Sequence, residues 1–213
     1  MLVCEIFKSI QGESSYAGLP CVFIRLAGCN LGCRWCDTPY ARVPDEATEF
    51  LIEEVLREVT RYGDCGLVEI TGGEPLLQEE TKELARRLLD KGRTVLIETN
   101  GSVPVSGLDE RVVKIVDVKC PSSGHAGSFL LENLSHITPE DEIKLVIADR
   151  GDYDWAKEFI EEVLRGRTEK VLFAPVKPDL SPRDLAAWIL RDGLRVRLQL
   201  QLHSYIWPEE RGR

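Results

Sequence analysis

The stretch CVFIRLAGCNLGCRWCDT, residues 21–38, decides the fold of this chain of 213 residues. It opens with an apolar run that is typical of a strand buried on both faces. Three cysteines follow within eight residues, at Cys29, Cys33 and Cys36. Disulfides use thiols in pairs, and a structural zinc site usually takes four protein ligands. Three thiolates instead fit a [4Fe-4S] cluster whose fourth iron stays open to a small molecule.

The residues between the cysteines favour a ligand-binding loop. Gly28 and Gly32 let the backbone turn tightly around a bulky group. Asn30, Arg34 and Asp37 make the loop polar, which disfavours a chance cluster of buried thiols. A zinc site completed by a distant His, Asp or Cys is the alternative that the cysteine spacing leaves open. We expect the remaining cysteines to be small buried residues: Cys4, Cys21, Cys65 and Cys120.

Apolar runs like the first one recur along the chain and predict a largely parallel sheet. The expected strands are residues 21–27, 66–70, 94–98, 112–118, 142–147 and 170–174. Segments of helical period separate several of them, at 45–63, 76–92, 152–166 and 181–193. This alternation indicates βα units with right-handed crossovers. Because a full eight-unit barrel needs about 250 residues, we expect an α/β fold with an incomplete barrel of roughly six mainly parallel strands.

Two helices carry local signals. In residues 45–63, Phe50, Leu51, Val55, Leu56 and Val59 share one predicted apolar stripe. The last helix opens with a predicted N-cap, Ser181, followed by a proline at the first helical position.

Composition limits the function. The chain shows no repeat or linker, so we expect a single domain over residues 1–213. A net charge of −9 without a basic tract disfavours a nucleic-acid partner. No apolar run has the length of a membrane span, and the first residues lack a signal-peptide core, so we expect a cytoplasmic protein with reduced thiols.

A second motif lies at another strand end. Residues 66–70 lead into Thr71-Gly72-Gly73-Glu74-Pro75, where the glycines expose backbone carbonyls and Glu74 can fix the turn. Alone, this motif is an ordinary turn. Together with Cys-x3-Cys-x2-Cys after a strand, it resembles the radical S-adenosylmethionine (SAM) superfamily. That resemblance implies a [4Fe-4S] cluster on three cysteines, with SAM chelating the fourth iron and being cleaved to a 5′-deoxyadenosyl radical.

Within the superfamily, residues 9–38 resemble the N-terminal block of the 7-carboxy-7-deazaguanine synthase family. The matching pattern is Ile-Gln-Gly-Glu, Gly and Pro, Phe-x-Arg-x-x-Gly-Cys-Asn, and Cys-x-Trp-Cys-Asp-Thr. Residues 198–207 are similar to the family's C-terminal Gln-x-His-Lys-x-x-Trp block, with Ser204 where lysine is common.

The resemblance implies a reaction and a set of substrate contacts. The reaction is a radical ring contraction of 6-carboxy-5,6,7,8-tetrahydropterin, with loss of ammonia. An amide and a carboxylate suit the pterin edge, and the Arg25 guanidinium suits the substrate carboxylate. A surface ion pair is the alternative for Arg25, and a core or surface histidine is the alternative for His203. The implied substrate-binding residues are Ile10, Gln11, Gly12, Glu13, Arg25, Thr71 and His203.

Cofactor contacts follow in the same way. Thr38 matches the family's Mg²⁺ ligand, although by pattern alone it is an N-cap or turn residue. Cys29, Cys33 and Cys36 match the cluster ligands. The implied SAM contacts are Trp35, Gly72, Gly73, Glu74, Glu98, Lys119, Cys120 and Ser122. For several of these residues, a role in forming a turn is an equally good interpretation.

The resemblance also implies a flavodoxin or ferredoxin as electron donor and a homodimer. A contact between substrate and the terminal carboxylate of Arg213 is left open. Two other functions remain to be separated from this one: another radical SAM enzyme, such as a glycyl-radical activase, and a non-catalytic Fe–S or zinc protein.

Overall fold

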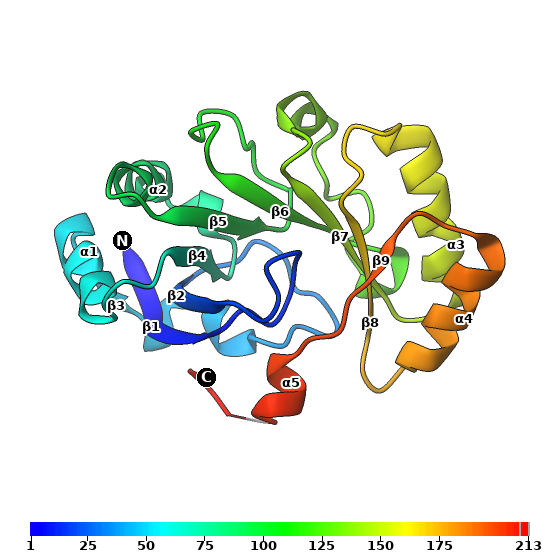
Figure 1. Cartoon of the computed structure of the whole chain (residues 1–213), viewed down its shortest axis with the longest axis horizontal. Coiled ribbons are helices and arrows are strands. Elements are labelled where there is room, and N and C mark those ends of the chain that lie inside the picture. The colour runs from blue at the N-terminus through cyan, green and yellow to red at the C-terminus, as the bar shows by residue number, and fades with distance from the viewer. Residues whose placement is uncertain (209, 213) are drawn as a thin grey trace.

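The computed structural model describes residues 1–208 and 210–212, which form one curved nine-stranded sheet with helices outside it (Figure 1). The strand order is β3-β1-β2-β4-β5-β6-β7-β8-β9. The strands are β1 (Leu2–Ile10), β2 (Pro20–Leu26), β3 (Thr48–Glu49), β4 (Leu67–Gly72), β5 (Thr94–Thr99), β6 (Val113–Val118), β7 (Glu142–Ile147), β8 (Val171–Pro175) and β9 (Arg197–Leu198).

All six predicted strands are present, as β2 and β4 to β8. Every neighbouring pair from β2 to β9 is parallel, whereas β1 pairs antiparallel with both β2 and β3. The sheet ends at β3 and β9 and does not close, so the expected incomplete barrel is confirmed. Three strands were not predicted from the sequence. β3 and β9 are only two residues long, and the half-exposed residues of β1 lack a continuous apolar run.

Helices α1 to α4 follow the outside of the sheet, and α5 lies across its open side (Figure 1). The α-helices are α1 (Ile52–Arg61), α2 (Glu80–Asp90), α3 (Arg150–Glu158), α4 (Pro182–Asp192) and α5 (His203–Ile206). A π-helical segment, η6 (Phe159–Leu164), continues α3. The short 3₁₀ segments are η1 (Pro39–Ala41), η2 (Pro44–Glu46), η3 (Pro75–Leu77), η4 (Pro121–Ser123) and η5 (Leu131–His136).

The predicted helix signals are mostly confirmed. The Ser181 hydroxyl accepts a hydrogen bond from the backbone N–H of Asp184 and caps α4. Val55, Leu56 and Val59 are buried on α1, but the prediction for Leu51 was wrong. Leu51 is 68% exposed because it stands at the N-cap position, before the first helical turn fixes which side chains face the sheet.

The two faces of the sheet differ in chemistry because strand side chains alternate between them. The outer face packs on the helices through two large apolar clusters. On the inner face, a small apolar cluster is built around Phe23, Leu67, Leu96 and Ile115. The inner face then becomes polar toward the carboxyl ends of the strands, and this change positions the site.

No helix in the described part of the chain has the length and apolar character needed to cross a membrane.

Candidate active site

A cavity of about 670 Å³ opens at the carboxyl ends of the parallel strands, on the inner face of the sheet. It brings together segments from both ends of the chain. The lining includes Ile10, Gln11, Gly12, Glu13, Arg25, Cys29, Cys33, Trp35, Cys36, Thr38, Thr71, Gly72, Gly73, Glu98, Lys119 and His203. The predicted residues Glu74, Cys120 and Ser122 do not line it.

The three-cysteine loop begins directly after β2. All seven cysteines of the chain are free thiols, and those of Cys29, Cys33 and Cys36 face the same cavity. The Cys29 sulfur accepts hydrogen bonds from the Leu31 backbone N–H, at 3.5 Å, and from the Asn100 amide, at 3.9 Å. Hydrogen bonds to sulfur are a common means of tuning cluster thiolates. The donor set therefore fits an iron–sulfur cluster.

Burial raises the pKa of the Cys29 and Cys33 thiols. Because a metal binds the thiolate, loading this loop releases protons.

Two neighbouring loops hold the cysteine loop in place. The backbone N–H of Gly32 donates to Nε2 of His125, at 2.9 Å, and the N–H of Arg34 donates to the carbonyl of Ser123. The Asn30 amide donates to the Ser102 hydroxyl at 2.8 Å. No sequence pattern singled out His125, since its partner is a backbone group brought near only by folding.

The glycines of the Thr-Gly-Gly-Glu-Pro turn allow it to pack against the start of the cysteine loop. A β-carbon added at Gly73 would lie 2.1 Å from the carbonyl oxygen of Gly28. At Gly72, where φ is +135°, it would lie 2.1 Å from the carbonyl oxygen of Leu26. Larger side chains are therefore excluded at both positions.

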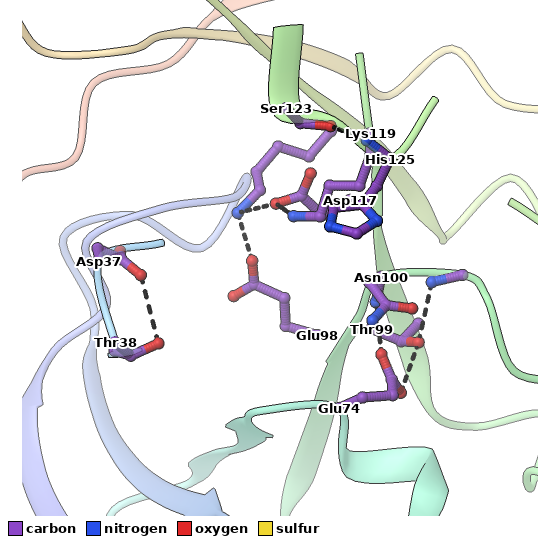
Figure 2. Close-up of polar contacts among 12 residues, drawn as sticks. Asp37, Thr38, Glu74, Glu98, Thr99, Asn100, Asp117, Lys119, Ser123 and His125 are labelled. Atoms are coloured by element: carbon purple, nitrogen blue, oxygen red, sulfur yellow. Dashed lines mark hydrogen bonds and ion pairs between the residues drawn. The ribbon is translucent and has the colours of Figure 1, made fainter. Parts of the chain in front are cut away.

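Glu74 is a buried support for the turn (Figure 2). Its carboxylate accepts hydrogen bonds from the Thr99 hydroxyl, at 2.9 Å, and from the Asn100 backbone N–H, at 2.7 Å. It also accepts one from the backbone N–H of Leu76. Glu74 thus joins the ends of β4 and β5, as the turn-fixing interpretation expected, and its side chain does not reach the cavity.

The loop after β6 is divided between cavity and core. Lys119 lines the cavity and pairs with Asp117, with 3.0 Å between Nζ and Oδ2. The Cys120 side chain is 1% exposed within the apolar core, and burial raises the pKa of its thiol. The Ser122 hydroxyl donates to Asp149 at 3.0 Å. The side chains of Cys120 and Ser122 therefore have structural partners in this arrangement.

Glu13 is the most strongly engaged residue of the N-terminal block. Its carboxylate accepts hydrogen bonds from the amides of Gln199 and Gln201 and pairs with the Lys144 ammonium at 2.9 Å. Burial acts to raise the pKa of Glu13, but the charge of Lys144, with hydrogen bonds from Lys144 and Gln201, holds it at about 2. Glu13 is therefore an ionised hydrogen-bond acceptor at the cavity wall.

Gln11 meets a carboxyl group that the sequence analysis did not assign. Its amide donates a short hydrogen bond to Glu69, on the inner face of β4. Burial, and next the charge of Glu98, raise the pKa of Glu69 to about 8. At neutral pH the Glu69 carboxyl is therefore mostly protonated, and the pair presents both donors and acceptors to the cavity.

Arg25 lines the cavity from β2 and is also ion-paired. Its Nε donates to Glu5 at 2.8 Å, and Tyr40 donates its hydroxyl proton to the same carboxylate at 2.7 Å. The guanidinium carbon lies 5.8 Å from the centre of the Phe7 ring. Within the described residues its terminal Nη groups make no hydrogen bond, so they are available to an anionic ligand.

Thr38 stands at the N-cap position of η1, yet its side chain makes no capping hydrogen bond. Its hydroxyl lies 3.4 Å from Asp37 and lines the cavity. Glu13, Asp37 and His203 bring ligand atoms within 4.8 Å of one another nearby. Because Lys144 already neutralises Glu13 and exposed acidic groups commonly cluster without an ion, we assign no metal to that group of three.

The C-terminal segment reaches the N-terminal block. The Leu202 backbone N–H donates to the carbonyl of Gly12 at 3.0 Å, which places His203 at the cavity. Lys177, after β8, donates to the Ser204 hydroxyl at 2.9 Å. Arg213, whose terminal carboxylate was left open above, lies outside the described residues.

Among the charged cavity residues that were missed, three stand on strands: Glu69, Asp117 and Lys144. Each interrupts an apolar strand, as in LVEIT, KIVDV and EIKLVI. A charged residue inside such a run was the available signal, because burying a charge is costly unless a partner compensates it. The sequence does not name the partners.

This combination of a partial parallel barrel, a three-cysteine loop after a strand and a glycine turn beside it defines a radical SAM enzyme. Residues 23–191 match the family model described as the Radical SAM superfamily, so the chain belongs to that superfamily.

Full-length relatives narrow the assignment. A 7-carboxy-7-deazaguanine synthase from Koribacter versatilis is 48% identical over 227 residues and covers 100% of both chains. One from Chlorobaculum tepidum is 48% identical and covers 99% of this chain and 96% of its own. The chain belongs to the 7-carboxy-7-deazaguanine synthase family.

Solved structures agree on the fold. The crystal structure of QueE from Escherichia coli superposes with a TM-score of 0.79, covering 95% of this chain and 94% of that one. Its sequence identity is 24%, so this likeness bears on the fold alone.

Proposed function

We propose that this chain is a carbon–nitrogen lyase that converts 6-carboxy-5,6,7,8-tetrahydropterin into 7-carboxy-7-deazaguanine with loss of ammonia. One observation carries the proposal. A single cavity is lined by the cysteine loop, the glycine turn, the Gln11–Glu13 block and His203. The relatives that match over the full length are named for this synthase activity.

Cys29, Cys33 and Cys36 would hold a [4Fe-4S] cluster, and the glycine turn would hold SAM beside it. When bound, these groups supply one-electron chemistry that abstracts a hydrogen atom. The chain's own contribution is to fix both partners in one cavity, which lowers the entropic cost of bringing the reacting atoms together.

The polar wall of the cavity suits a bicyclic substrate with a carboxylate. The ionised Glu13 and the Gln11 amide offer acceptors and donors for the pterin edge. The Nη groups of Arg25, which make no hydrogen bond within the described part of the chain, would bind the carboxylate. His203 would donate to the substrate from α5. Ile10, Gly12 and Thr71 would complete the contact surface.

Thr38 would be the protein ligand of a Mg²⁺ ion. Mg²⁺ prefers oxygen ligands, keeps several waters and is usually held by few protein groups. The hydroxyl of Thr38 lacks a capping role and faces the cavity, which supports this assignment. A bound Mg²⁺ would orient the substrate carboxylate.

The cofactor wall would be completed by Trp35, Glu98 and Lys119. Glu98 presents a carboxylate suited to ribose hydroxyls. Cys120 and Ser122 would contribute through the backbone of their loop, since their side chains have partners elsewhere.

The cysteine loop is accessible from outside, since Asn30, Gly32 and Arg34 are exposed. We therefore propose that an external flavodoxin or ferredoxin reduces the cluster at this loop. By family resemblance we propose a cytoplasmic homodimer, whose mass in solution can be measured by light scattering.

The decisive experiment is anaerobic reconstitution followed by incubation with dithionite, SAM and the carboxypterin. The expected product is a deazaguanine chromophore with the mass of 7-carboxy-7-deazaguanine, and SAM is regenerated. Cys33→Ala, which lacks one cluster ligand, is the negative control. SAM cleavage without conversion of the carboxypterin would instead favour another radical SAM activity, such as a glycyl-radical activase. Absence of SAM binding would favour a non-catalytic Fe–S or zinc protein.

A further inference from the structure

Lys144 lines the cavity and pairs with residues from three other parts of the chain. Its ammonium pairs with Glu13 at 2.9 Å, with Asp117 at 3.2 Å and, through a very short contact, with Glu98. Figure 2 shows the carboxylates of Glu98 and Asp117 pointing toward the same ammonium group, which is that of Lys144, a side chain without a label there. These partners come from the loop after β1, from β5 and from β6, while Lys144 stands on β7.

This arrangement joins two parts of the cavity that have different proposed ligands. Glu13 belongs to the substrate side, and Glu98 belongs to the SAM side. The Lys144 side chain is only 5% exposed, so little water screens its charge from either carboxylate. No other described cation pairs with Glu13 or Glu98.

We propose that Lys144 is a positioning residue that holds Glu13 and Glu98 in place as acceptors at once, and so links the substrate-binding and SAM-binding halves of the site. This inference rests on the proposed function for the identity of the substrate. Its SAM half rests on membership of the superfamily and on the proposed contact between Glu98 and SAM. A purely structural ion pair is the competing explanation.

The chain contains a matched example of that competing explanation. Lys114, on β6, is 4% exposed and pairs with the buried Asp141 at 2.9 Å. Neither residue lines the active-site cavity. Lys114→Gln therefore removes a buried ammonium of similar exposure without touching the site.

The charged groups that face Lys144 decide the pH dependence. They are Glu13 from the loop after β1, Glu69 from β4, Glu98 from β5, Asp117 from β6 and Lys119 from the loop after it. Burial raises the pKa of Glu98, and Lys144 opposes that rise. Without the ammonium the pKa of Glu98 rises further, so Glu98 becomes protonated at a higher pH and loses the negative charge that strengthens the hydrogen bonds it accepts. As the pH is lowered, SAM affinity should therefore begin to fall at a higher pH in the variant than in the wild type.

The test measures the dissociation constants of SAM and of the carboxypterin on anaerobically reconstituted, oxidised enzyme, between pH 6 and pH 9. For Lys144→Gln we expect both ligands to bind at least about tenfold more weakly, which is about 1.4 kcal/mol each. We also expect the pH midpoint of SAM binding to move up. Lys114→Gln should leave both affinities and the midpoint unchanged.

Wild-type affinities and an unmoved midpoint in Lys144→Gln would overturn the inference, as would loss of one ligand alone. If Lys144→Gln does not fold, Lys144→Arg is measured in its place. The arginine keeps the positive charge but cannot place it at the same distances from Glu13, Glu98 and Asp117. Lys144→Arg should weaken both ligands several-fold with a wild-type midpoint, and unchanged affinities would overturn the inference. Failure of the wild type to bind the carboxypterin would contradict the proposed substrate. The SAM measurements would still decide for or against Lys144, because it contacts Glu98 whichever molecule binds at Glu13.

Discussion

Gly12 and His203, from opposite ends of the chain, are in direct contact at the cavity wall. A β-carbon added at Gly12 would lie 2.4 Å from Nδ1 of His203. The Leu202 N–H also donates to the Gly12 carbonyl, so the glycine sets both the backbone and the side-chain position of α5. Any larger residue at position 12 must displace the histidine.

Gly12→Ala is therefore expected to raise the KM for the carboxypterin about tenfold, because the His203 contact to substrate is lost, at about 1.4 kcal/mol. SAM affinity should remain at the wild-type value. Gly66→Ala is the control, since a β-carbon there meets nothing within 4 Å. An unchanged KM in Gly12→Ala would exclude a close role for His203 in binding the substrate.

Gly73→Ala tests whether the glycine turn is needed to shape the cluster loop. The added methyl group would collide with the Gly28 carbonyl at 2.1 Å, and overpacking of this kind costs about 1–3 kcal/mol. We expect less iron per chain after reconstitution and a lower melting temperature than in Gly66→Ala. Full iron loading with wild-type stability would show that the loop can move away without cost.

Thr38→Ala should lose most of the activation by Mg²⁺, because the hydroxyl ligand is removed. The visible absorption of the cluster should persist, since Cys29, Cys33 and Cys36 are untouched. Thr38→Ser keeps the oxygen and should retain activation. Mg²⁺ activation that survives in Thr38→Ala would refute the assignment.

Glu69→Gln is expected to change how stability depends on pH. In the folded chain the pKa of Glu69 is about 8, mainly through burial, whereas an unfolded Glu has a pKa of about 4.3. Between these values the folded state binds the extra proton. Wild-type stability should therefore fall as pH rises, by at most about 1.4 kcal/mol per pH unit from this residue.

Gln at position 69 cannot ionise and still accepts the hydrogen bond from the Gln11 amide. Urea unfolding under anaerobic conditions at pH 5, 7 and 8.5 should show the variant gaining stability relative to the wild type as pH rises. A constant difference between the two proteins across that range would mean that Glu69 is ionised in the folded state.

Local pattern was sufficient for the framework of this protein. The apolar runs predicted β2 and β4 to β8, because strands buried on both faces need continuous apolar residues. Strand β1 was not predicted because its side chains are half-exposed. Strand β3 was not predicted because two residues are too few to show a hydrophobic pattern. Cysteine spacing predicted that Cys29, Cys33 and Cys36 would meet at one site, and all three line one cavity because they are close in sequence as well as in space.

The prediction of site residues was limited by contacts between residues that are far apart in the sequence. Glu74, Cys120 and Ser122 lie in matching motifs, yet their side chains pack or hydrogen-bond away from the cavity. Alternation along a strand indicates which residues share a face, but the neighbour across that face depends on strand order and stagger.

The sequence by itself determined a parallel α/β framework and a loop with three cysteines, because both depend on patterns among residues that are near one another along the chain. Only the tertiary structure decided that Lys144 meets Glu13, 131 residues away, together with Glu98 and Asp117. The physical reason is that a buried charge needs a partner, while the curvature of the sheet selects which partner comes within reach.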